Sequence, residues 1–212
     1  MVHGSRLGAV IALLAFAGID ASLSGRYRFA PSWISSALGL VLLVLVLAPR
    51  FARDPRMARL GVKMMTFFIA LIIVLNATNM IDVVGDVLFH PQGIDATALI
   101  LTTLAIWSAN VAGFSLLYWA LDRGGPDARA AHEPAKFDFD FPAYQDADKV
   151  GPGWAPNFMD YLFLGFTTAT AFSPTEAMPL SSRAKALMIL QSLVSLITVI
   201  VVAARAIGII PS

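Results

Sequence analysis

The sequence contains no cysteine, which excludes disulfide bonds, thiolate metal sites and cysteine-based catalysis. It has three histidines, His3, His90 and His132, and their spacing does not match that of metal ligands. No His-Glu metalloprotease motif and no Ser-His-Asp set appears along the chain. The pattern therefore predicts neither a metal site nor a cofactor, and it does not predict an enzyme.

Charge is also scarce. Charged residues make up 14% of the 212 residues, whereas 58% are hydrophobic and the mean hydropathy is +0.73. A typical soluble domain has about 25% charged residues. The formal net charge of +1, without a basic and aromatic-rich patch, gives no indication of nucleic-acid binding. The composition instead predicts an all-α, multi-pass protein of a lipid bilayer, which we place in the inner membrane of a bacterium.

Five apolar stretches have lengths suited to membrane-crossing helices. They cover residues 7–23, 32–48, 60–82, 96–121 and 183–210. The first stretch also allows a second interpretation as a cleaved signal peptide, because Arg6 precedes it and Ala21 resembles a cleavage-site residue. We expect a four-span bundle over residues 1–121, a polar loop over 122–157 and a C-terminal unit over 158–212.

Four arginines recur at every third position between the second and third stretches: Arg50, Arg53, Arg56 and Arg59. This spacing is similar to that of voltage-sensor helices. However, Asp54 and Pro55 interrupt the run, and the intervening residues do not form a spanning apolar helix. We interpret the segment as a cytoplasmic loop, with or without a short interfacial helix, that follows the positive-inside tendency.

The third stretch becomes polar at its end, and residues 83–95 are expected to form a loop. Asn79, Asp82 and Asp86 are spaced i, i+3 and i+7, so they share one helix face. Ionisable residues near a membrane are candidates for function, here a vestibule that attracts cations. The alternative for Asn76 and Asn79 is a stripe of hydrogen bonds between helices.

The polar loop 122–157 has seven acidic and four basic side chains. Within it, the run Phe137–Tyr144 alternates aromatic with acidic residues, a period typical of an extended strip. Two hypotheses remain for Asp138 and Asp140. In the first, the two carboxylates gather cations near a pore mouth. In the second, they belong to a solvated edge of the extended strip.

The segment 158–171 predicts a short amphipathic helix of about 20 Å, too short to cross a hydrocarbon core of about 30 Å. Pro174 and Pro179 then prevent a continuous helix. Ser181 and Ser182 are suitable N-cap residues for the long apolar helix that follows. A half-length helix, an irregular turn and a full span together predict a re-entrant element.

This C-terminal unit resembles the pore-loop unit of potassium channels. The segments that carry the resemblance read Tyr161-Leu-Phe-Leu-Gly-Phe-Thr-Thr-Ala-Thr170, Pro179-Leu-Ser-Ser-Arg-Ala-Lys185 and Ala203-Ala-Arg-Ala-Ile-Gly208. In that family a pore helix ends in Thr-Thr-x-Thr, the selectivity filter follows, and a pore-lining helix begins after a proline. The whole chain is also similar to a group of bacterial multi-pass membrane proteins that carry such a unit. The resemblance implies a homo-oligomer, a tetramer if channel-like, and a monovalent cation as the permeant species.

The chain departs from the family where the filter would lie. Potassium channels continue with Thr-Val-Gly-Tyr-Gly-Asp, whereas this chain continues with Ala171-Phe-Ser-Pro-Thr-Glu176. Filter glycines adopt backbone conformations that residues with a Cβ avoid, so a carbonyl filter is not expected. We expect instead a wider path lined by hydroxyl groups, with Glu176 at its rim. The pore and filter candidates are Thr167, Thr168, Thr170, Ala171, Phe172, Ser173, Thr175 and Glu176.

The last helix carries a polar stripe that includes Gln191, Ser195 and Thr198. This stripe either packs against another helix or lines a wet path. The sequence predicts an ion-channel-like protein, and the alternative is a non-conducting scaffold, sensor or partner subunit. The arginine loop and the re-entrant unit share one side of the membrane. The positive-inside tendency places that side in the cytoplasm, whereas the channel pattern places the pore loop outside.

Overall fold

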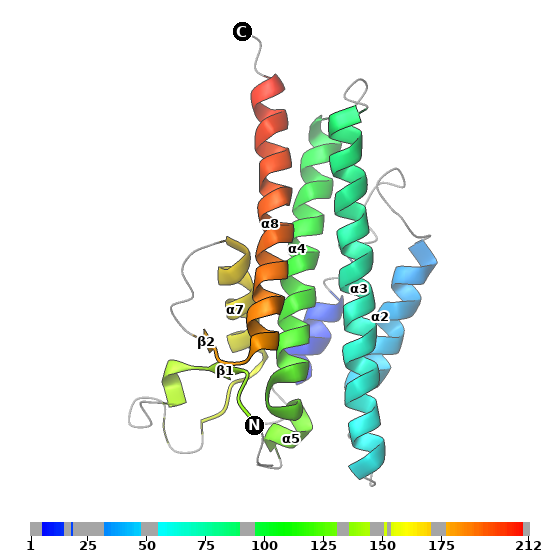
Figure 1. Ribbon diagram of the computed structural model, residues 1–212. Coiled ribbons are helices and arrows are strands. Elements are labelled where there is room, and N and C mark those ends of the chain that lie inside the picture. The colour runs from blue at the N-terminus through cyan, green and yellow to red at the C-terminus, as the bar shows by residue number, and fades with distance from the viewer. Residues whose placement is uncertain are drawn as a thin grey trace.

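The computed structural model describes residues 6–14, 18, 32–47, 55–89, 96–130, 136–144, 151, 154–170 and 177–209. Most of these residues are helical, and the long helices lie side by side along one axis (Figure 1). This confirms the predicted all-α class. Among the described residues, strand is confined to one short antiparallel pair at one end of the bundle.

Four helices make up most of the bundle. They are α2 (Ser32–Leu47), α3 (Pro55–Phe89), α4 (Ala96–Leu121) and α8 (Ser182–Ile209). Residues 6–14 are also helical, and they lie against the bundle through Gly8, which faces the ring of Phe158. Apart from residue 18, the remainder of the predicted 7–23 span lies outside the described residues.

Within the described ranges, three helical stretches are long and apolar enough to cross a membrane: Leu60–Phe89, Thr97–Gly124 and Ser182–Val201. A shorter apolar stretch, Ala37–Leu47, lies within α2. The structure therefore contains three of the five predicted spans as membrane-length helices.

Helix α3 extends beyond the predicted span in both directions. It begins at Pro55, because proline fits the first turn of a helix, where its missing N–H has no intrahelical partner. Arg56 and Arg59 therefore lie on helix α3 and not in a loop. The expected loop over 83–95 is wrong for residues up to Phe89, since the polar side chains after Asn79 continue on the same helix.

The end of α4 turns sharply through a 3-10 turn at Asp122–Gly124 and a short helix, α5 (Pro126–Ala130). Arg123 has φ 50°, a left-handed conformation that is uncommon for a residue with a Cβ. Gly125 also has positive φ, at 97°, and a Cβ there would lie 3.0 Å from the Ala120 carbonyl oxygen. The tight turn thus requires glycine at position 125.

Helix α7 (Phe158–Thr170) confirms the predicted short helix. It lies along one half of α8 and ends partway along it (Figure 1). Strands β1 (Phe139–Asp140) and β2 (Met178–Pro179) pair at the end of the bundle where α7 and α8 both begin. Helix α7 therefore starts at this end of the bundle, and the chain is at the same end again in β2, after residues 171–176.

The core is concentrated at this end. Its largest fully buried aromatic side chains are Phe114, Tyr118, Trp119, Phe139 and Tyr161. They come from α4, β1 and α7, so the polar loop contributes to the core together with the helices. The loop strip is shorter than predicted, because Pro142–Tyr144 forms a 3-10 turn directly after β1.

Candidate functional site

Helix α7 packs closely against α4 through Gly165. A Cβ at Gly165 would overlap Ser115 Oγ and would lie 3.2 Å from the Val111 carbonyl oxygen. Further along, Phe166 packs edge-on against Trp107, with ring centroids 5.7 Å apart. Because glycine lets the two helix backbones approach, α7 packs closely against α4.

A buried glutamine connects three helices, α8, α4 and α7, by hydrogen bonds. Gln191 of α8 is 0% exposed. Its side-chain oxygen accepts a hydrogen bond from Tyr118 Oη of α4 at 2.6 Å, and its Nε2 donates to the Gly165 carbonyl of α7 at 2.7 Å. The amide thus satisfies one polar group on each neighbouring helix, which fixes the depth of α7 relative to α8.

The rest of the predicted polar stripe also faces the interior of the chain. Asn110 Nδ2 of α4 donates to Ser195 Oγ at 2.8 Å and to the Gln191 carbonyl at 3.1 Å. Thr198 Oγ1 donates to the Val194 carbonyl of its own helix at 2.7 Å. Gln191, Ser195 and Thr198 are all buried, so within one chain this stripe packs against α4 and α7.

The threonines at the end of α7 bind their own helix. Thr167 Oγ1 and Thr168 Oγ1 donate to the carbonyls of Phe163 and Leu164 at 2.9 and 2.8 Å. Thr170 Oγ1 donates to the Phe166 carbonyl at 3.0 Å. Each hydroxyl therefore donates its hydrogen bond within α7, and each oxygen retains lone pairs that can accept a hydrogen bond or contact a cation.

The other predicted filter residues, Ala171, Phe172, Ser173, Thr175 and Glu176, lie outside the described residues. On the near side, the Thr168 carbonyl accepts a hydrogen bond from Ser192 Oγ of α8 at 3.3 Å. On the far side, Ala177 is already buried in the main core. The structure thus fixes both ends of the candidate filter segment.

A fully buried carboxylate, Asp122, lies at the end of α4. Its Oδ2 accepts a hydrogen bond from Tyr161 Oη of α7 at 2.6 Å, and its Oδ1 accepts from the Asp138 backbone N–H at 3.0 Å. Arg123 Nε lies 3.6 Å from Oδ2. The carboxylate therefore connects α4 to α7 and to the polar loop, a role that helix-face periodicity cannot predict.

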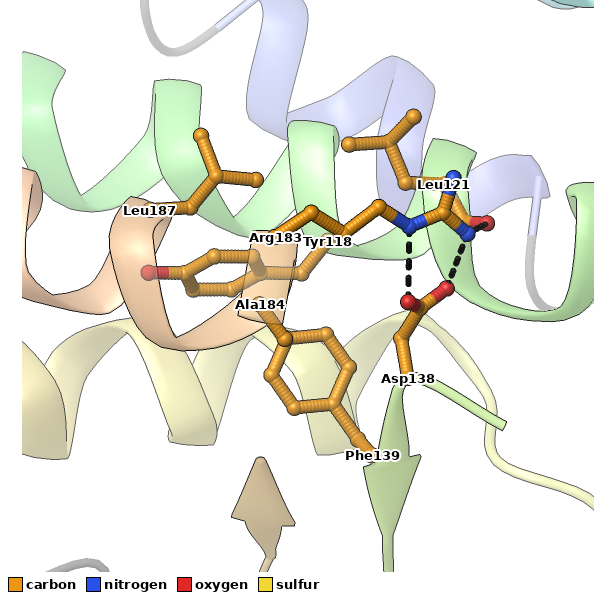
Figure 2. Close-up of a pocket in the computed structure, with 7 residues that line it drawn as sticks. All are labelled: Tyr118, Leu121, Asp138, Phe139, Arg183, Ala184 and Leu187. Carbon is orange, nitrogen blue, oxygen red and sulfur yellow. Dashed lines mark hydrogen bonds and ion pairs between the residues drawn. The ribbon is translucent and has the colours of Figure 1, made fainter. Parts of the chain in front are cut away.

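The second carboxylate of this region, Asp138, anchors the start of α8. It accepts hydrogen bonds from Ser181 Oγ at 2.5 Å and from Arg183 Nε at 2.7 Å, and Arg183 makes a second bond to its other oxygen (Figure 2). Asp138 is 3% exposed, so the predicted solvated edge is wrong at this position. The carboxylate turns inward because Arg183 and Ser181 compensate its burial. The expected N-cap is confirmed, since Ser181 Oγ accepts from the Ala184 N–H at 3.1 Å.

Two further side chains close this end of the bundle. Arg129 donates to the carbonyls of Asp122 and Trp119 at 2.5 and 2.8 Å, and it lies 5.1 Å from the Tyr161 ring centroid. Burial lowers the pKa of Arg129, while Tyr161 and Asp122 oppose that shift. Burial also raises the pKa of Tyr144 to about 12, against the opposing effect of Arg123. The Tyr144 hydroxyl therefore stays protonated near neutral pH.

The vestibule candidates lie at the opposite end of the bundle. Val62 of α3 is level with Gly125, because a Cβ there would lie 3.2 Å from Val62 Cγ1. Asp82 lies about 30 Å further along the helix, at a rise of about 1.5 Å per residue. Asn79 is buried, Asp82 is exposed and Asp86 is half-buried. The structure therefore does not bring this face together with the start of α7.

Nearer the middle of the bundle, Asn76 Nδ2 donates to the Ile106 carbonyl of α4 at 3.1 Å. This is the kind of hydrogen bond between helices that was one alternative for Asn76. Across the described ranges, no group of three or more His, Asp or Glu side chains could hold a metal ion.

Comparisons with protein-family models, with curated proteins and with solved structures gave no match for this chain. Its function therefore has to be argued from its own geometry.

Proposed function

We propose that the chain is a multi-pass protein of a bacterial inner membrane, with five spans and α7 as a re-entrant helix, and that it acts as a channel-like protein for small cations. The observation that carries this proposal is the placement of α7. It begins at the same end as α8, runs in the same direction and ends beside Ser192, with Gly165 bonded to Gln191.

Such a half-helix is suited to attract cations within a membrane. The last carbonyls of a helix lack intrahelical partners, and the C-terminus carries a partial negative charge equivalent to about half an electron. The threonine oxygens of Thr167, Thr168 and Thr170 lie in this last turn. With Glu176 at the rim and no filter glycines, the path is wider than a carbonyl filter and favours small cations over anions.

The outer faces of the long helices support insertion in lipid. Large apolar side chains are exposed along them, including Phe67, Val74, Leu101, Leu193 and Ile200. An exposed apolar surface of this extent is unfavourable in water and favourable against acyl chains. Since one chain places its polar stripe in its own interior, a conducting path requires several copies around an axis.

A second candidate function has its own support. Gln191, Ser195 and Asn110 bind one another and do not leave polar groups open toward an axis. This arrangement favours a non-conducting scaffold, sensor or partner subunit that keeps the pore-unit architecture for packing.

Flux into liposomes separates the two functions. Purified protein at high occupancy should pass monovalent cations above the background of empty vesicles, and Glu176→Gln should lower that flux by removing the rim charge. Glu133→Gln in the polar loop is the matched control and should leave flux unchanged. Background flux from the unaltered protein would exclude the channel and leave the non-conducting role.

A further inference from the structure

Apart from Arg205, the lysines and arginines of the described residues lie at one end of the bundle. This is the end where α7 begins, and the side chains come from five segments of the chain. Arg6 binds the Val46 carbonyl and Asp127, Arg123 and Arg129 lie at the end of α4, and Arg183 binds Asp138. Arg56 and Lys63 lie in the first turns of α3, Lys136 precedes β1, and Lys185 lies in the first turns of α8.

The charges that face outward at this end are mainly positive. Arg56, Lys63, Lys136 and Lys185 are exposed. The two most buried carboxylates, Asp122 and Asp138, point inward and are bonded to Tyr161, Ser181 and Arg183. The other described carboxylates at this end, Asp127, Asp140 and Asp160, are half-buried.

The opposite end has a different composition. Its described charged residues are Asp82 and Asp86 of α3 and Arg205 near the end of α8. Arg26 and Arg28 lie outside the described residues. The described part of the chain is therefore strongly asymmetric in lysine and arginine along the bundle axis, while acidic residues carry little weight in orientation.

We propose that the end carrying this basic surface faces the cytoplasm and contacts the anionic headgroups of the inner leaflet. The inference rests on the proposed membrane insertion. Lysine and arginine are retained on the cytoplasmic side, where the negative surface potential of the leaflet also attracts them. Helix α7 then enters the membrane from the cytoplasm, and the pore-like unit is inverted relative to the potassium-channel pattern.

The absence of cysteine makes orientation directly measurable, because single cysteines can be introduced without any background. Lys136→Cys and Lys185→Cys report the basic end, and both positions are exposed. Leu88→Cys and Phe89→Cys report the opposite end, where these side chains are 66% and 76% exposed. A membrane-impermeant maleimide is applied to intact bacterial cells and to permeabilised cells. Labelling of protein denatured in detergent gives the total amount of reactive cysteine.

We expect Lys136→Cys and Lys185→Cys to react only after permeabilisation, and Leu88→Cys and Phe89→Cys to react in intact cells. The reverse pattern, or equal labelling of both ends in intact cells, would overturn the proposal. So would a basic end that reacts only after denaturation, because that end would then not face water. Recovery of the unaltered chain in the soluble fraction would instead refute membrane insertion, and loss of flux alone would leave the orientation intact.

Discussion

At the scale of single residues, Gln191 is the side chain on which the position of α7 depends most. It accepts from Tyr118 and donates to the Gly165 carbonyl, and it has no contact with solvent. An apolar residue of similar size fills the same volume but leaves two buried polar groups without partners. The free-energy cost of such a group is about 1–3 kcal/mol in a protein interior, and hydrogen bonds between membrane helices contribute about 0.6–1.7 kcal/mol.

We therefore expect Gln191→Leu to destabilise the protein by about 1–3 kcal/mol. The measurement is thermal unfolding of purified protein in detergent. Ser192→Ala is the matched control on the adjacent position, because Ser192 makes only a long hydrogen bond of 3.3 Å to α7, and its effect should be smaller. Equal unfolding midpoints for Gln191→Leu and the unaltered protein would show that the amide does not hold α7.

The Asp138–Arg183 pair predicts an asymmetric response to mutation. The Asp138 side chain is 5% exposed, whereas the Arg183 side chain is 55% exposed. Removing the arginine leaves a buried carboxylate, but removing the carboxylate leaves an arginine that can reach water. Arg183→Met should therefore destabilise the protein more than Asp138→Asn, by about 1–2 kcal/mol after allowance for solvent screening.

Denaturant unfolding of both single variants and of the double variant measures this difference. Lys185→Met is the control, because Lys185 is an exposed cation two positions along the same helix. If Asp138→Asn proved the more damaging change, the carboxylate would be stabilised mainly by Ser181 and not by Arg183.

At the scale of helices, local pattern predicts most boundaries. The apolar runs predict α2, α4 and α8 to within a residue or two, and the two prolines after residue 171 predict the end of α7. The predicted span 60–82 is shorter than α3, because Asp82 and Asp86 do not end the helix. Burial of Asn79 and Val83 against neighbouring helices stabilises helix there despite the polar sequence.

The site could be predicted only in part. Gln191, Ser195 and Thr198 share a helix face, so periodicity identifies them, and Ser181 is recognisable as an N-cap. Asp122 and Asp138 could not be found in this way. Their partners Tyr161 and Arg183 lie 39 and 45 positions away, and such contacts form only when the polar loop folds back onto the bundle.

Helix α7 should be sensitive to a single added methyl group at Gly165. Gly165→Ala would force Cβ against Ser115 Oγ and toward the Val111 carbonyl, so α7 would move away from α4. Overpacking of this kind costs about 1–3 kcal/mol. Adding Ser115→Ala should recover part of the loss, because it removes the atom that the new methyl overlaps.

Gly85→Ala is the matched control for this test. It is also a helical glycine, and its Cβ would meet nothing within 4 Å. Alanine should be neutral or stabilising there, by up to about 1 kcal/mol, because glycine is a poor helix former. Unfolding in detergent separates the two substitutions, and a similar effect of both would show that close approach of α7 and α4 is unimportant.

At the scale of the whole molecule, the direction of each helix determines which of its ends lies at the basic end of the bundle. The N-terminal helix and α3 run away from the basic end, α2 and α4 run toward it, and α8 carries the C-terminus to the opposite end (Figure 1). Within a single chain, α7 begins at the basic end and is covered by α4 and α8. Met159 and Phe163 remain exposed on its other side.

The channel proposal therefore predicts an oligomer, since irregular backbone at membrane depth must be covered by protein or by water and cannot face lipid. Light scattering or native mass spectrometry of protein in mild detergent should give a mass of several chains of 22.7 kDa each, with four expected if the pore-unit resemblance holds. Substitution of Phe163 by glutamate should dissociate the complex by placing a charge within an apolar interface, whereas glutamate at Leu101, on the exposed face of α4, should not. A monomer that remains folded and membrane-bound would contradict an axial path between copies and favour the non-conducting role.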